Sequence, residues 1–263
     1  MFVRRDLTDF VETRAGSLYF EKSGKGFPLV LLHPLGMSTW VWEAIRGSLS
    51  EQFTVYAFDM LGHGKSDKPK HEFSISDYAE SLDDACQVLN IHRAHFIGNS
   101  VGACLAIEMA SRYPDRIDKL VLVGCPVWNI SESDERIKAF QFDFDDAGLP
   151  KPRTLQELKE KSTFANPTEQ LLLSVNQSRS QAGIWVKNLS TALAYYDVYP
   201  KLNLVSASKT LILYGEADRL LPAAPILKHN IIRSLSIIIP GVGHVPQVEN
   251  PVAFTNILNE FLS

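Results

Sequence analysis

The chain has 263 residues and a formal net charge of −4, with 45% hydrophobic and 21% charged residues. This composition is typical of a globular protein, and the length fits one α/β domain that carries an insertion. There is no cluster of lysine and arginine that would mark a nucleic-acid-binding face, and no apolar run is long enough to span a bilayer. The opening residues have no apolar signal-peptide core, and the three cysteines form no CxxC pair. We therefore expect a cytoplasmic protein that binds neither nucleic acid nor membrane, in an oligomeric state that the sequence leaves open.

Short apolar runs alternate with longer amphipathic segments along the chain. The apolar runs predict strands, and the helical spacing of apolar residues between them predicts helices. The strands are predicted at 17–22, 28–33, 53–59, 94–99, 119–124, 210–215 and 235–240, and the helices at 40–49, 75–90, 101–112, 223–232 and 252–262. Asn250 and Pro251 supply an N-cap and a first-turn proline for the last helix. Continuous apolar strands separated by helices indicate an α/β fold with a mostly parallel sheet covered on both faces.

One region interrupts this alternation. Between 127 and 205 there is no strong strand signal, and helical segments are separated by Pro150, Pro152 and Pro167. We expect a core formed by residues 1–126 and 206–263, with residues 127–205 inserted as a helical lid that sets substrate choice.

The sequence around Ser100 matches a strained turn that presents a nucleophile. Gly98-Asn99-Ser100-Val101-Gly102 fits the pattern G-x-S-x-G at a strand-to-helix junction, where small residues on either side let the two backbones approach. Such a turn lifts the serine oxygen above the sheet, next to a helix N-terminus that favours developing negative charge. An ordinary glycine-bracketed turn is the alternative, and the strand–turn–helix context favours catalysis.

A catalytic serine needs a base and an acid that orients the base. Asp218 directly follows one predicted strand, and His244 lies in a glycine-containing loop after the last strand. The carboxyl ends of parallel strands meet at one edge of the sheet, and the order Ser, Asp, His is the one expected for this turn. The sequence predicts a catalytic triad of these three residues. The remaining candidates among the histidines are treated as surface residues: His71, His92, His95 and His229.

Further residues are expected at the same edge. The "HPLG" turn after the strand at 28–33 contains Pro34, which has no N–H, so the backbone N–H of Leu35 is the predicted partner of the Val101 N–H in an oxyanion hole. The glycine-rich segment "DMLGHGKSDKP" at 59–69 is interpreted as a structural connection. Five side chains are expected to contact substrate: His33, Asn99, Trp128, Trp185 and Val245.

Taken together, "HPLG", "DMLGHGKSD", "GNSVG", "GEAD" and "GVGH" resemble the α/β-hydrolase fold family along the whole chain. Asparagine before the serine, and "GH" followed by "PQVENP", are similar to small-molecule esterases, lactonases and the carbon–carbon hydrolases of aromatic-ring degradation. Proline replaces the usual glycine after His33, and Ala103 stands where a second glycine is frequent. In the carbon–carbon hydrolases a lid arginine holds a substrate carboxylate, for which Arg179 is the best match here.

The resemblance implies a serine hydrolase that cleaves a small ester, lactone or thioester through an acyl-enzyme. Two alternatives remain open: hydrolysis of a carbon–carbon bond in a ring-cleavage diketone, and use of the pocket as a small-molecule receptor. Cofactor-free oxygenation or peroxidation is a more distant alternative. No metal-ligand cluster or dinucleotide-binding motif occurs in the sequence, so we expect no metal and no cofactor.

Overall fold

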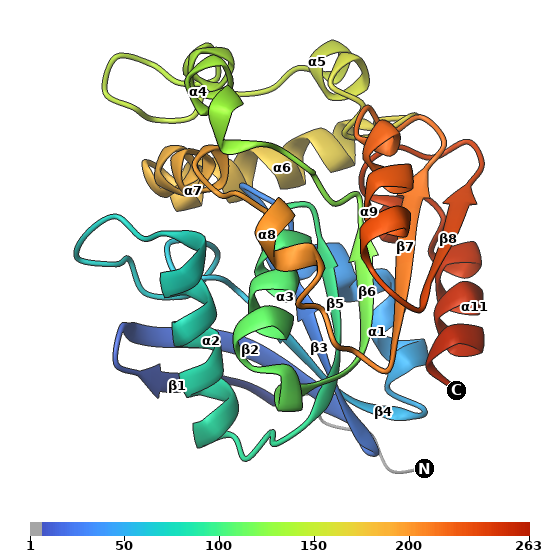
Figure 1. Ribbon diagram of the computed structural model, residues 1–263. Helices are drawn as coiled ribbons and strands as arrows, with labels where there is room; N and C mark the ends of the chain where they lie inside the picture. The colour runs from blue at the N-terminus through green and yellow to red at the C-terminus, as the bar shows by residue number, and fades with distance from the viewer. Residues whose placement is uncertain (1–6) are drawn as a thin grey trace.

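The computed structural model describes residues 7–263, which form an eight-stranded sheet flanked by helices (Figure 1). The strand order is β1-β2-β4-β3-β5-β6-β7-β8. Strand β2 is antiparallel to both of its neighbours, β1 and β4, and the remaining six strands are parallel to one another. The strands are β1 (Leu7–Thr13), β2 (Gly16–Gly24), β3 (Phe27–Leu32), β4 (Phe53–Phe58), β5 (Ala94–Asn99), β6 (Ile117–Val123), β7 (Lys209–Gly215) and β8 (Ser234–Ile239). The predicted fold class, a mostly parallel sheet of the α/β type, is confirmed.

Helices cover both faces of this sheet. One face is covered by α2 (Ile75–Val88), α3 (Val101–Arg112) and α9 (Ala224–Asn230), and the other by α1 (Glu43–Leu49) and α11 (Pro251–Leu262) (Figure 1). Strands β3, β5 and β6 lie in the middle of the sheet and are almost fully buried, which explains their uninterrupted apolar sequences. In α11 the Asn250 side chain accepts a hydrogen bond from the Ala253 N–H at 3.1 Å, as the predicted N-cap requires.

The segment between β6 and β7 contributes no strand to the sheet. It contains α4 (Ser133–Gln141), α5 (Leu155–Glu160), α6 (Glu169–Ala182), α7 (Trp185–Ala194) and α8 (Tyr199–Leu202). We call residues 127–205 the insertion. Its helices α4 to α7 lie above the end of the sheet where β6 and β7 finish (Figure 1).

Two sequence-based expectations differ from the structure. Strand β1 was not predicted, because its sequence LTDFVET mixes charged and apolar residues at the edge of the sheet. His95 was expected at the surface, but it belongs to β5 and is buried between the rings of Phe27 and Phe53, at centroid distances of 4.7 and 5.7 Å. Burial lowers the pKa of His95 to about 4, and this effect outweighs the opposite one of Asp118, whose Oδ2 lies 3.2 Å from His95 Nδ1.

Candidate active site

Ser100 occupies a strained turn between β5 and α3. Its backbone has φ 59° and ψ −118°, a conformation that L-residues rarely adopt, and its N–H donates to the Val123 carbonyl at 2.8 Å. A Cβ at Gly98 would lie 2.1 Å from the Gly102 carbonyl oxygen, and a Cβ at Gly102 would lie 2.3 Å from that of Leu32. The two glycines are therefore required because helix, turn and neighbouring strand touch through their backbones.

His244 and Asp218 form a hydrogen-bonded pair at the same edge. The His244 Nδ1 lies 2.8 Å from Asp218 Oδ2, and Asp218 is buried directly after β7. The other carboxylate oxygen of Asp218 accepts the Leu220 N–H at 2.9 Å, which fixes the orientation of the carboxylate. Gly124, with φ 53°, packs under the pair: a Cβ there would lie 2.7 Å from His244 Nδ1 and 2.8 Å from Asp218 Oδ2. This arrangement leaves Nε2 as the imidazole nitrogen available to a proton donor.

Asn99 connects the serine turn to the histidine loop. Its side-chain amide donates to the carbonyls of Val123 and His244, both at 3.1 Å, and its oxygen accepts from Gln247 Nε2 at 2.9 Å. Asn99 is fully buried and does not line the cavity above Ser100. The expectation that it contacts substrate is replaced by a role in holding the His244 backbone.

The two amides predicted for an oxyanion hole are free to act as donors. Within residues 7–263, neither the Leu35 N–H nor the Val101 N–H donates a hydrogen bond. Leu35 lines the cavity that contains Ser100, and Val101 is the first residue of α3. The hydrogen-bonding capacity of both amides is therefore unused among the described residues.

His33 lies below the cavity instead of lining it. It is fully buried, its Nδ1 pairs with the Pro34 carbonyl at 2.8 Å, and its Nε2 accepts the Met60 N–H at 3.0 Å. Burial lowers the pKa of His33 to about 4, so the ring is neutral at physiological pH. Both ring nitrogens of His33 are occupied in fixing the loops after β3 and β4, so they are not available to a ligand in the cavity.

The cavity above Ser100 has a volume of about 130 Å³ and contains both Ser100 and His244 in its lining. It is small compared with typical ligand pockets of roughly 300–1,000 Å³, so this conformation accommodates only a small ligand. Its apolar wall comes mainly from the insertion: Trp128, Phe140, Phe144, Val175, Val186 and Leu193.

Of the two insertion tryptophans expected at the substrate, only Trp128 lines this cavity. Trp185 instead covers Gly62, where an added Cβ would lie 2.7 Å from the tryptophan Cβ. Val245, the neighbour of His244, is fully buried in the core with α11. Adjacency in the chain placed Val245 near the site, but its side chain points into the core.

The cavity lining also contains charged residues of the insertion, most of which the sequence did not predict. Asp143 accepts hydrogen bonds from Arg153 Nη1 at 2.9 Å and Lys161 Nζ at 2.6 Å. Burial alone would raise the pKa of Asp143, but these two partners lower it to about 2. One carboxylate therefore faces two cations, and the same lining contains Arg179 of the insertion and Arg219 of the core as further cations. The acid and its partners lie in irregular segments between helices and carry no recognisable spacing.

Arg179 is a buried cation with unused donors. Only 7% of it is exposed, and its Nε and Nη2 have no hydrogen-bond partner in the described part of the chain. Burial, followed by repulsion from Arg153, lowers the pKa of Arg179 to about 10, so the guanidinium stays charged near neutral pH. It lies against Gly36, in the loop that carries Leu35. A buried unpaired charge is costly, so an anion would be bound strongly here.

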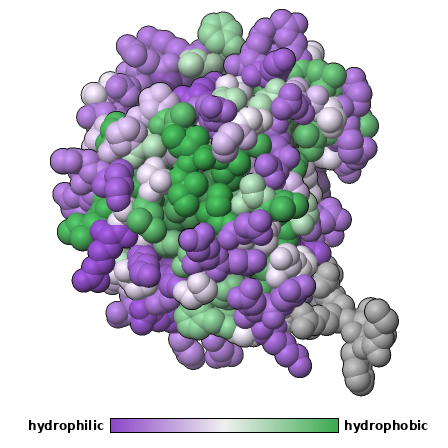
Figure 2. Space-filling model, turned by 90° about the vertical axis from the view of Figure 1, so that its right-hand side faces the viewer, coloured by the Kyte–Doolittle hydropathy of each residue, from purple (hydrophilic) through white to green (hydrophobic). Residues whose placement is uncertain are grey.

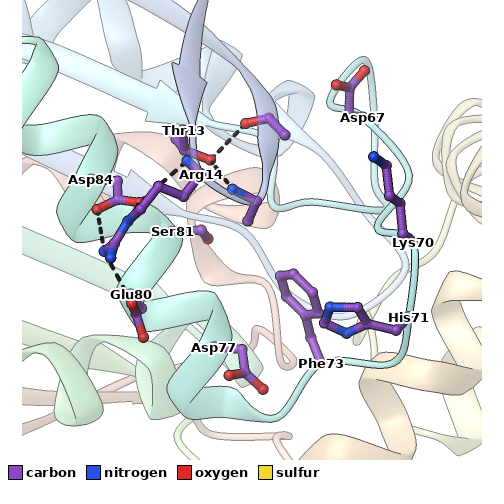
Figure 3. A pocket seen from close by; sticks show the side chains of 12 residues that line it. Thr13, Arg14, Asp67, Lys70, His71, Phe73, Asp77, Glu80, Ser81 and Asp84 are labelled. Carbon is purple, nitrogen blue, oxygen red and sulfur yellow. Dashed lines mark hydrogen bonds and ion pairs between the residues drawn. The ribbon is translucent and has the colours of Figure 1, made fainter.

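A wider cavity of about 590 Å³ lies elsewhere, between the β1–β2 turn, the loop before α2 and α2 itself (Figure 3). Arg14 forms ion pairs with Asp84 at 2.7 Å and Glu80 at 3.0 Å across one side of it. The Asp77 carboxylate accepts the backbone N–H of Ser74, the N-cap of α2, at 2.8 Å. Arg14 is thus paired with two carboxylates and Asp77 with Ser74, and neither Ser100 nor His244 lines this cavity, so it is not the candidate active site.

The fold and the serine, histidine and aspartate at one sheet edge define the class of this protein, and comparison with known families agrees. Residues 28–251 match the model of the alpha/beta hydrolase fold family, and the chain belongs to that family. No helix among residues 7–263 is both long enough and apolar enough to cross a membrane.

Several proteins named as hydrolases are similar over most of the chain. The 2-hydroxymuconate semialdehyde hydrolase of Pseudomonas sp. (strain CF600) is 26% identical, over 92% of this chain and 88% of that protein. The pimeloyl-[acyl-carrier protein] methyl ester esterase of Pectobacterium carotovorum subsp. carotovorum (strain PC1) is 29% identical, over 91% of this chain and 96% of that protein. The enol-lactonase structure from Burkholderia xenovorans LB400 has a TM-score of 0.79 at 20% identity, over 97% of this chain and 99% of that chain, which shows a shared fold.

A stronger but shorter match is to an uncharacterized protein of Mycobacterium tuberculosis (strain ATCC 25618 / H37Rv). It is 38% identical over 105 residues, which are 40% of this chain and 31% of that protein. The match therefore spans less than a third of the mycobacterial protein, and it carries no activity over to this chain.

Proposed function

We propose that this protein is a serine hydrolase that cleaves a small carboxylic ester, lactone or thioester through an acyl-enzyme. The observation that carries the proposal is that Ser100, held in a strained turn, shares one cavity with His244, whose Nδ1 lies 2.8 Å from buried Asp218. Relatives named as an esterase and lactone-degrading enzymes with the same fold support this reaction class.

The chemistry needs only side chains and backbone amides. Ser100 Oγ attacks the substrate carbonyl carbon while His244 Nε2 accepts its proton, and the negative charge on Asp218 stabilises the resulting imidazolium. The N–H groups of Leu35 and Val101 stabilise the oxyanion, at about 3–4 kcal/mol of barrier for each well-placed donor. His244 then protonates the leaving oxygen or sulfur, and water, activated by the same imidazole, releases the acid.

Covalent labelling tests the nucleophile. A fluorophosphonate should attach to Ser100, as read by peptide mass spectrometry, and Ser100→Ala should remain folded while kcat falls at least ~10³-fold. Ser111, which lies on the helix α3 that follows Ser100 and is outside the cavity, is the matched control for substitution by alanine. Label on another serine, or full turnover by Ser100→Ala, would contradict the proposed triad. Binding of small molecules without any turnover would instead favour the alternative that the pocket serves as a small-molecule receptor.

Arg179 favours a substrate that carries a carboxylate. The cavity holds three cations of the insertion against one carboxylate, and two nitrogens of Arg179 are unpaired. A second candidate function follows, hydrolysis of a carbon–carbon bond in a ring-cleavage diketone, because such substrates carry a carboxylate and the relative of strain CF600 is named for one of them.

The two reactions can be separated with matched substrates. A small ester bearing a free carboxylate, its neutral methyl ester and a 2-hydroxy-6-oxo-dienoate should be assayed with wild type, Arg179→Lys and Arg179→Met. We expect Arg179→Met to raise KM for the carboxylate-bearing substrates at least tenfold and to leave the neutral ester unaffected, with Arg179→Lys intermediate because it keeps the charge without the fork. Equal effects on the charged and the neutral ester would mean that Arg179 supports the cavity structurally.

A further inference from the structure

The two edge strands of the sheet differ in how they are protected. Strand β1 carries Asp9 and Glu12, whereas the β8 sequence SLSIII contains no charged residue and no proline. Natural edge strands usually carry charges or prolines that prevent pairing with another chain. An exposed edge strand that has no charged residue and no proline of its own, such as β8, is open to pairing with a partner strand.

The backbone of β8 has unused hydrogen-bonding groups along its outer side. The backbone carbonyl of Arg233 accepts the Thr210 N–H at 3.2 Å, and that of Ile239 accepts the Glu216 N–H at 2.9 Å. The backbone groups of the odd-numbered residues of β8 therefore point toward β7. Backbone N–H and C=O groups point to alternate sides from one residue to the next along a strand. The backbone groups of the even-numbered residues of β8 therefore point away from β7, toward solvent. Lys228 Nζ bonds the Ser234 carbonyl, which leaves the outward groups of Ser236 and Ile238 open.

Apolar side chains surround this open edge. Leu235 is 54% and Ile238 is 49% exposed. An adjacent cavity of about 710 Å³ between β8 and α9 is lined by Leu221, Pro222, Pro225 and Ile238, among others. Figure 2 shows the face of the molecule that carries β8, with apolar side chains gathered in its middle and hydrophilic ones around them. Such an apolar centre with a polar rim is typical of a protein–protein interface.

Charges at the two ends of β8 are complementary to each other. Exposed Arg233 precedes the strand, and exposed Glu216 lies at its other end, where its carboxylate accepts the Gly241 N–H at 3.0 Å. If two copies of β8 pair antiparallel, Arg233 of each copy approaches Glu216 of the other. Parallel pairing would bring like charges together.

We propose that a second copy of this chain docks at β8 by antiparallel strand pairing, which joins two sheets into one across a twofold axis. The main-chain groups of Ser236 and Ile238 form the central hydrogen bonds, and the exposed leucine and isoleucine side chains pack across the axis. Pro240 ends the pairing between the two β8 strands, because it has no N–H to donate.

Sedimentation velocity and light scattering over a concentration series test this proposal. The wild type should be a dimer that dissociates on dilution. Ser236→Pro should be monomeric, because the Ser236 N–H faces outward and its loss costs no bond inside the chain. Ile238→Lys should also be monomeric, and the matched control Phe10→Lys, at a 51% exposed position on β1, should remain dimeric. A monomeric wild type, or dimers of both β8 variants, would overturn the proposal.

A charge exchange tests the antiparallel register without touching the strand. Arg233→Glu and Glu216→Arg should each weaken the homodimer, since each places like charges face to face. Mixing the two variants should restore dimers, because both contacts of the mixed pair then join opposite charges. Should the mixture remain monomeric while each variant is folded by circular dichroism, the proposed pairing is wrong.

Discussion

Gly124→Ala is a sharp test of the candidate site because the substitution adds a single methyl group directly beneath the histidine–aspartate pair. The new Cβ would lie 2.7 Å from His244 Nδ1 and 2.8 Å from Asp218 Oδ2. Neither contact is sterically possible, so one partner must move. The Leu220 N–H holds the Asp218 carboxylate and the Asn99 amide holds the His244 backbone carbonyl, which leaves the 2.8 Å bond between the two side chains as the contact that breaks.

The expected cost can be divided between folding and catalysis. A φ of 53° at an alanine costs about 1–2 kcal/mol of folding free energy. Catalysis suffers more, since loss of the orienting aspartate in a serine triad lowers kcat by as much as ~10⁴-fold. Because the alanine displaces the carboxylate without removing it, we expect kcat to fall by roughly 10²- to 10³-fold, with KM changed little.

The assay is steady-state hydrolysis of an activated ester, together with the rate of fluorophosphonate labelling at Ser100. Gly241→Ala is the matched control: Gly241 has φ 70°, and a Cβ there would meet no atom within 4 Å. It should show the stability loss alone. If Gly124→Ala is folded and turns over substrate as fast as Gly241→Ala, then the His244–Asp218 pair does not support catalysis.

Two further outcomes are expected. The pKa values of His33 and His95 are lowered to about 4 by burial, while an unfolded histidine titrates near ~6.5, so the unfolded state binds more protons between these values. The contribution of these two histidines to the free energy of unfolding should be fully present above pH ~6.5 and should fall toward pH 4, by roughly 3 kcal/mol for each histidine. Urea titrations at several pH values should show that His95→Asn makes the free energy of unfolding depend less steeply on pH. Asn99→Ala should lower kcat more than it raises KM, because it frees the His244 backbone without opening the cavity, and Asn99→Asp should not rescue it, since a carboxylate cannot donate to the two carbonyls.

The sequence was sufficient for the central strands and for the geometry of the serine turn. Strands β3, β5, β6 and β7 are buried on both faces, so their apolar runs are unmistakable. Strand β1 could not be found in this way, because one of its edges faces solvent and its charged residues are tolerated there. His95 was misjudged because its apolar neighbours, Phe27 and Phe53, belong to strands distant in the chain.

The candidate triad was predictable because each of its members follows an apolar strand: Ser100 and Asp218 follow the buried strands β5 and β7, and His244 follows the apolar edge strand β8. The walls of the cavity were not predictable. Trp185 covers Gly62 while Trp128 lines the cavity, although both are aromatic residues of the insertion. Their placement depends on how helices α4 to α7 pack, and no spacing in the sequence encodes that packing. The same limit applies to Asp143, which becomes part of the site only through its two cationic partners.

Arg179 lies where the insertion meets the core. Arg179 belongs to α6 of the insertion, yet its side chain lies against Gly36 in the core loop that supplies the Leu35 amide. Arg179 is buried and two of its nitrogens have no hydrogen-bond partner in the described part of the chain, so its desolvation is not offset at those two atoms. On the proposed function, a substrate carboxylate that pairs with Arg179 should therefore stabilise the packing of the insertion against the core. A neutral analogue of the same size should not.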